Sequence, residues 1–109
     1  MFHMLSCFDL KKGVSINEFS ESNTVFATHM KELDLLESIG PIGQRQKHPV
    51  MDTDDERSQE YFFLMSFKDR EQCDRAVDCI QSGAEPEISI HHDVTCKIDN
   101  YVFVCWADI

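Results

Sequence analysis

The chain has 109 residues, of which 42% are hydrophobic, and its formal net charge at pH 7 is -10. This length and composition suit one folded domain, which we expect to span residues 1–109. Twenty acidic against ten basic residues disfavour nucleic acids and anionic membrane surfaces as partners, because both are bound by clustered positive charge.

Signals for membrane insertion and for secretion are missing from the sequence. No run of about 18 uncharged apolar residues occurs, so we expect no membrane-spanning segment. The N-terminus has no basic region ahead of its apolar residues, which a signal peptide would carry. The five cysteines form an odd set without a Cys-x-x-Cys pair, which favours reduced thiols over disulfides. These features predict a cytoplasmic protein.

The first third of the chain changes from a strand pattern to a helix pattern. Residues 2–8 are short, aromatic and apolar, and they predict a strand. A helix follows, with a capping box formed by Ser15 and Glu18, and we expect it to end at Gly40 and Pro41. Its predicted apolar stripe consists of Ile16, Phe19, Asn23, Phe26, Met30 and Leu33.

The middle of the chain predicts two strands separated by a loop. Residues 42–48 read as a polar strand, which we place at a sheet edge. Residues 49–59 lack periodicity and are dense in acidic side chains, so we expect a solvated loop. Residues 60–67 show the clearest strand pattern in the chain.

The last part of the chain predicts one helix and one strand. Residues 68–83 form an amphipathic pattern that ends at Gly83. Its inward-facing residues are expected to be Cys73, Ala76, Val77 and Ile80. Residues 84–100 have no clear pattern and are expected to be mostly irregular, and residues 101–109 predict the last strand.

The order of these elements is strand, helix, strand, strand, helix, strand. Two right-handed crossovers that share one antiparallel sheet predict an α+β, ferredoxin-like βαββαβ fold, with a four-stranded sheet and two helices on one face. A sheet covered on one face should alternate apolar with polar residues, but residues 60–67 and 101–109 are apolar on both faces. No segment remains to cover the second face, so we predict a homodimer joined through it.

Strand alternation divides the first strand between the two faces. Phe2, Met4, Ser6 and Phe8 share one face, and His3, Leu5, Cys7 and Asp9 share the other. If the first set packs on the helices, His3 and Cys7 point into the dimer interior. The same alternation places Phe62 and Trp106 near them.

The opening sequence FHMLSCFDLKKGVS resembles that of dimeric α/β-barrel proteins, particularly the stress-responsive type. There, a strand with an early histidine runs into a lysine–glycine–serine turn and a helix. The corresponding residues here are His3, Lys11 or Lys12, Gly13 and Ser15. The order of elements matches along nearly the whole chain. The resemblance implies a ferredoxin-like dimer whose two sheets enclose a small, often aromatic ligand. Cofactor-free monooxygenases, cyclases, isomerases and haem-degrading enzymes share this fold, which therefore does not choose among activities.

His3 is the best candidate for chemistry. In a mostly apolar pocket it could act as a general base on an acidic carbon or a phenol, or it could be a structural histidine hydrogen-bonded across the interface. Arg45 and His48 would either meet a carboxylate or enolate at the barrel rim or face water. Cys7 has no neighbouring base in the sequence, so nucleophilic catalysis is poorly supported. The expected ligand-binding residues are His3, Cys7, Arg45, His48, Phe62 and Trp106.

The stretch IHHDVTC, residues 90–96, is the strongest metal-like pattern in the chain. His92 and Cys96 have the spacing of a helical metal pair, but no second pair supplies the remaining ligands of a zinc site. Adjacent histidines also diverge on either a strand or a helix. We expect this stretch to be an exposed polar loop, and we predict neither a metal nor a cofactor.

Three functions remain open on the sequence. The first is a homodimer that binds a small apolar or aromatic molecule between its sheets. The second is a cofactor-free enzyme, a monooxygenase or a cyclase or isomerase, with His3 as general base and with Phe62 and Trp106 as walls of the pocket. The third is a structural dimer whose interface is filled by side chains and leaves no pocket.

Overall fold

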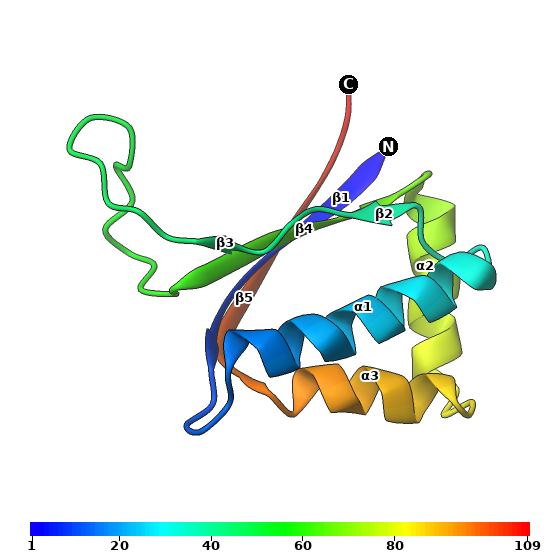
Figure 1. The fold of residues 1–109 in the computed structure, drawn as a ribbon. Coiled ribbons are helices and arrows are strands. Elements are labelled where there is room, and N and C mark those ends of the chain that lie inside the picture. Colours follow the sequence, from blue (N-terminus) through cyan, green and yellow to red (C-terminus); the bar gives the residue numbers. More distant parts are fainter.

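A computed structural model of the protein describes residues 1–109, and Figure 1 shows its sheet with all the helices on one face. The elements are β1 (Phe2–Leu10), α1 (Ile16–Glu32), β2 (Ser38–Ile39), β3 (Gly43–Gln44), β4 (Tyr61–Phe67), α2 (Arg70–Gln81), α3 (Glu87–Thr95) and β5 (Ile98–Ala107). None of the helices is both long enough and apolar enough to cross a membrane.

The sheet is antiparallel and has the strand order β2-β4-β1-β5, with β3 also paired to β4. This is the order expected of two crossovers that share one sheet, so the predicted α+β topology is confirmed. Of the predicted strand at 42–48 only the two residues of β3 form, and the two residues of β2 lie before Pro41 in the segment predicted as helix. The sheet therefore has five strands rather than the four expected. Proline has no amide hydrogen to donate, which helps to explain why this edge is broken.

Helix α1 begins as the sequence predicts and ends earlier than expected. The Ser15 hydroxyl accepts a hydrogen bond from the Glu18 amide at 3.1 Å, and the Glu18 carboxylate accepts one from the Ser15 amide at 3.2 Å. The predicted end at Gly40 is wrong, because the helix stops at Glu32. Asp34 takes a left-handed φ of 58°, which turns the chain so that Leu36 enters the core at 4% exposure.

Asp69 caps the N-terminus of helix α2, where its side chain accepts a hydrogen bond from the Gln72 amide at 2.8 Å. Gln72 and Ala76 are its buried residues. Cys73, Ala76 and Ile80 pack inward as the sequence predicts, whereas Val77, which was also expected to face in, is 45% exposed. The helix is rotated so that the face carrying Gln72 and Ala76 meets the core.

Helix α3 replaces the irregular segment that the sequence predicted, so that expectation, and with it the two-helix count, is wrong. No side chain caps its N-terminus, and Val94 is its one buried residue, which explains the weak pattern. Contacts with α1 hold it instead. The Ser22 hydroxyl donates to the Asp93 carboxylate at 2.9 Å, and His29 and Glu87 approach to 3.3 Å.

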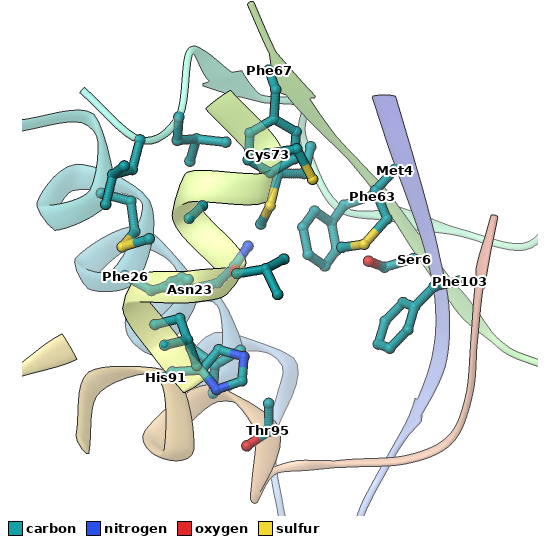
Figure 2. A pocket seen from close by; sticks show the side chains of 18 of the residues that line it. Met4, Ser6, Asn23, Phe26, Phe63, Phe67, Cys73, His91, Thr95 and Phe103 are labelled. Carbon is teal, nitrogen blue, oxygen red and sulfur yellow. The ribbon is translucent and has the colours of Figure 1, made fainter. Parts of the chain in front are cut away.

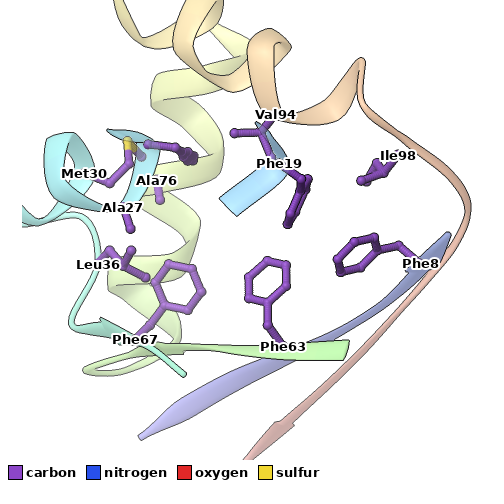
Figure 3. Close-up of a cluster of buried hydrophobic side chains, with 11 residues drawn as sticks. Phe8, Phe19, Ala27, Met30, Leu36, Phe63, Phe67, Ala76, Val94 and Ile98 are labelled. Atoms are coloured by element: carbon purple, nitrogen blue, oxygen red, sulfur yellow. The ribbon is translucent and has the colours of Figure 1, made fainter. Parts of the chain in front are cut away.

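The core fills the space between the sheet and the helices, as Figure 3 shows. Phe8 and Phe19 are fully buried, with ring centroids 4.6 Å apart, and Phe63 lies against both. These rings come from β1, α1 and β4, so a single aromatic cluster joins the two central strands to the first helix. Burying aromatic surface of this size is the dominant stabilising contribution in a small domain.

A buried polar residue, Gln72, joins α2 to the link between α1 and β2. Its side-chain oxygen accepts a hydrogen bond from the Lys68 amide at 2.7 Å. Its side-chain nitrogen donates to the Asp34 carbonyl at 3.2 Å and to the Glu37 carboxylate at 3.1 Å. Gln72 itself is 0% exposed, so its carboxamide depends on these protein groups for its hydrogen bonds.

We expect Gln72→Met to destabilise the protein by about 2–4 kcal/mol, because it removes the three hydrogen bonds that this buried carboxamide makes. The free energy of unfolding in urea measures this effect. The matched control is Gln81→Met on the exposed end of the same helix, which should change stability by less than about 0.5 kcal/mol. Equal effects of the two substitutions would contradict the role assigned to Gln72.

Candidate functional site

A cavity of about 340 Å³ lies between the helices and the sheet (Figure 2). Of the 22 residues that line it, 17 are hydrophobic, and they come from all three helices and from β1, β4 and β5. Its volume falls within the range of small-molecule sites, which are mostly apolar with a few polar groups. The cavity exists within one protomer and needs no partner to form.

Two buried polar side chains line this apolar cavity. Ser6 on β1 is 2% exposed, and its hydroxyl oxygen has no hydrogen-bond partner. Asn23 on α1 is 3% exposed. Figure 2 shows the two side chains directed toward the cavity from opposite sides. A buried polar group without a partner is costly, so a hydroxyl in this position calls for a functional explanation.

His91 on α3 contributes a further polar group to the cavity wall, which also includes Gln81 and Thr95. Its ring lies 5.5 Å from that of Phe26, centroid to centroid. Burial, assisted by the neighbouring charge of His92, lowers the pKa of His91 below its ordinary value. The imidazole is therefore neutral at pH 7, with one nitrogen to donate and one to accept. The expectation that residues 90–96 form an exposed polar loop is thus wrong.

The opposite side of the sheet, here called the outer face, is largely apolar, and no helix covers it. Three rows of side chains cross it, Trp106–His3–Ser66, Val104–Leu5–Leu64 and Val102–Cys7–Phe62. This division of β1 between two faces confirms the predicted alternation. The β5 members of the rows are 36–41% exposed in the single chain, so the outer face presents a patch of exposed apolar surface.

His3 lies on the outer face with both ring nitrogens engaged. Its Nδ1 is 2.8 Å from the Ser66 hydroxyl, and its Nε2 is 2.9 Å from the Asp108 carboxylate. The ring also packs on Trp106 at 5.3 Å between centroids. Hydrogen bonds from the N-terminal ammonium and from His3 lower the pKa of Asp108. The structure therefore brings His3 and Trp106 together, as the alternation predicts.

Arg45 organises the segment that follows β3. Its guanidinium donates two hydrogen bonds to Asp52, at 2.7 and 2.9 Å, one to the Asp54 carbonyl at 2.6 Å, and one to the Arg57 carbonyl. The hydrogen bond from Arg45 lowers the pKa of the Asp52 carboxyl group. We call residues 45–59 the arm, which projects beyond the sheet in Figure 1.

His48 also serves the arm, since its Nδ1 accepts hydrogen bonds from the Val50 and Met51 amides at 3.1 and 2.9 Å. Arg45 and His48 line a shallow hollow with Phe62. Their polar groups are used within the arm rather than directed at the cavity between helices and sheet. The proposed ligand-binding residues therefore divide between the arm and the outer face.

Cys7 lies next to Phe62 in the register of β1 and β4 and is 1% exposed. Burial raises the pKa of its thiol, which makes the thiolate scarce at neutral pH. The structure contains no cluster of three or more histidine, cysteine or acidic side chains arranged to hold a metal ion.

The sequence matches no family model and no curated protein, whereas the structure has many neighbours among solved proteins. One is protein At3g17210 from Arabidopsis thaliana, with a TM-score of 0.72, 10% identity, and coverage of 100% of this chain and 96% of that one. Another is a dimeric ferredoxin-like protein of unknown function from Jannaschia sp. CCS1, with a TM-score of 0.66, 14% identity and 98% coverage of both chains. The chain has a ferredoxin-like fold.

A third neighbour is SnoaB from Streptomyces nogalater, described as a cofactor-independent oxygenase. Its TM-score is 0.61 at 7% identity, with coverage of 99% of this chain and 92% of that one. At such identities the likeness concerns the fold, and the function of this chain must be argued from its own residues.

Sequence reasoning missed Ser6, Asn23 and His91 as a group. A signal for two of them was present, since Ser6 and Asn23 occupy positions where the periodicity of strand and helix calls for apolar residues. Neither pattern indicates which empty space a polar side chain will face. His91 was hidden because its helix was not predicted.

The lowered pKa of His91 predicts a pH dependence of stability. The unfolded chain binds a proton at His91 near pH 6.5, where the folded chain does not. Stability should therefore fall as the pH drops below about 6.5 and level off below the folded-state pKa. In His91→Phe, the loss of stability between about pH 7.5 and about pH 5 should be smaller, as urea unfolding would measure. The same loss in both proteins would contradict the burial of a neutral His91.

Proposed function

We propose that the protein is a homodimer joined through the outer face, and that each protomer binds a small, largely apolar molecule in the cavity between helices and sheet. The observation that carries this proposal is the 340 Å³ cavity with the unpartnered hydroxyl of Ser6 in its wall. The sequence placed the ligand between the two sheets instead. The cavity on the helix side is the better site, because it is already formed in the single chain.

The outer face supports the dimer part of the proposal. Its rows are apolar apart from the His3–Ser66 pair, and Trp106 is 41% exposed. The protein has a strong net negative charge, and this face is one where few charges would have to be desolvated on association. The neighbour from Jannaschia is described as dimeric. The narrower resemblance to the stress-responsive type and the cytoplasmic location stay predictions.

A second candidate is a cofactor-free enzyme with His3 as general base. The hydrogen-bonded chain Asp108–His3–Ser66 favours it, because a carboxylate that holds one imidazole nitrogen leaves the other able to accept a proton. The description of SnoaB as a cofactor-independent oxygenase adds a precedent for the fold. Under this function, His3→Gln would abolish turnover of a carbon acid such as anthrone without affecting binding in the cavity.

We expect the wild-type protein to sediment as a dimer at low micromolar concentration. Trp106→Asp should weaken the dimer by about 100-fold or more, because association would bury an unpaired carboxylate in an apolar face. The control is Val25→Asp, on an exposed position of α1, which should leave the dimer intact. A monomeric wild-type protein, or one that Trp106→Asp leaves dimeric, would contradict the assigned interface.

We expect the neutral fluorescent probe N-phenyl-1-naphthylamine to bind and to gain fluorescence in the cavity. Ala76 is 7% exposed on the cavity wall, so Ala76→Leu adds volume there and should weaken binding about 10-fold. Val25→Leu, outside the cavity, is the matched control and should bind as the wild type does. Unchanged binding to Ala76→Leu would place the probe elsewhere.

A further inference from the structure

The polar groups of the cavity are all uncharged at neutral pH. Its 22 lining residues include no aspartate, glutamate, lysine or arginine. The charged residues nearest in sequence to His91 are engaged elsewhere, since Asp93 accepts hydrogen bonds from Ser22 and Lys97. An ionised ligand would therefore lose its hydration without gaining a counter-ion, which is expensive in an apolar site.

The Ser6 hydroxyl is the polar group least able to find a partner within the protein. In the sheet register it stands between Phe63 and Phe103, so aromatic rings flank it on both sides. Its oxygen is buried and makes no hydrogen bond. A ligand that brings a donor or an acceptor to this hydroxyl forms a hydrogen bond that the protein alone lacks. Binding is favoured because the hydroxyl is already desolvated in the folded protein.

Asn23 and His91 add further hydrogen-bonding groups to the wall of the cavity. Asn23 is in the buried stripe of α1 and offers a donor and an acceptor from one carboxamide. His91 approaches from α3, so three different elements direct neutral hydrogen-bonding groups at one apolar space, as Figure 2 shows. A site built in this way discriminates by hydrogen bonding, since an analogue that lacks the polar group leaves buried partners unpaired.

We propose that Ser6, Asn23 and His91 make the cavity selective for uncharged ligands that carry a hydrogen-bonding group on an apolar ring system. This inference rests on the proposed function, because it concerns what the same cavity accepts. It adds that ligands with an ionised carboxylate are excluded from the cavity. It also makes Ser6 a residue that determines which ligands the cavity prefers.

Three probes of one shape test this selectivity by equilibrium dialysis at neutral pH. They are naphthalene, 2-naphthol and 2-naphthoate, which differ in having no polar group, a neutral hydroxyl and a charge. We expect 2-naphthol to bind about 3- to 10-fold more tightly than naphthalene, from one net hydrogen bond in the cavity. We expect no measurable binding of 2-naphthoate.

Substitution of Ser6 separates its role from that of the cavity as a whole. In Ser6→Ala, the ratio of the naphthalene Kd to the 2-naphthol Kd should fall toward one. The affinity for naphthalene should stay unchanged. The substitution removes a hydroxyl without a partner, so thermal melting should show no loss of stability. Ser20→Ala on α1, outside the cavity, is the matched control and should keep the wild-type preference.

The possible failures are distinguishable. Binding of N-phenyl-1-naphthylamine without preference between naphthalene and 2-naphthol would overturn the selectivity alone, and so would binding of 2-naphthoate as tight as that of 2-naphthol. An unchanged preference in Ser6→Ala would overturn the role of Ser6. Absence of binding by every probe would overturn the proposed function, and the selectivity with it.

Discussion

The antiparallel pairing of β1 with β4 is the constraint on which the rest of the structure depends. Ser6 pairs with Phe63 and Cys7 with Phe62, so this register decides which side chains meet the helices and which form the outer face. A slip of one residue would exchange the two faces completely. The aromatic contact between Phe8 and Phe19 opposes such a slip, because it fixes β1 against α1. The core, the cavity and the outer face all follow from this one alignment.

The cavity results from three helices that cover the sheet incompletely. α1 and α3 pack against each other, while β5 reaches past their cover, so that Phe103 lines the cavity and is still 47% exposed. A fold selected for stability alone would fill this space, because unfilled volume in a core costs contact energy. The unfilled volume and the unpaired hydroxyl together are the basis on which a ligand site is proposed here.

Much of the architecture could be predicted from the sequence. The order of elements, the capping box at Ser15 and the two-sided apolar strands are local patterns, and local patterns are what a sequence displays directly. The predicted end of α1 was wrong because the chain leaves the helix through a left-handed turn at Asp34. That turn is stabilised by the burial of Leu36, which is a tertiary effect. α3 was missed for the same reason, since contacts with α1 hold it rather than caps of its own. The cavity depends on how far three helices stand from the sheet, which no periodicity encodes.

Arg45 is the centre of a hydrogen-bond network within the arm. One guanidinium holds Asp52 and the carbonyls of Asp54 and Arg57, so the shape of the middle of this segment is set largely by contacts within it. Sequence changes at the exposed positions of the arm therefore cost the fold little while Arg45 and Asp52 remain, whereas the buried Gln59 ties the end of the arm to β5 through a hydrogen bond to the Asn100 carbonyl at 2.7 Å. During divergence from a common ancestor, the arm is where new surface properties could accumulate without disturbing the alignment of the central strands.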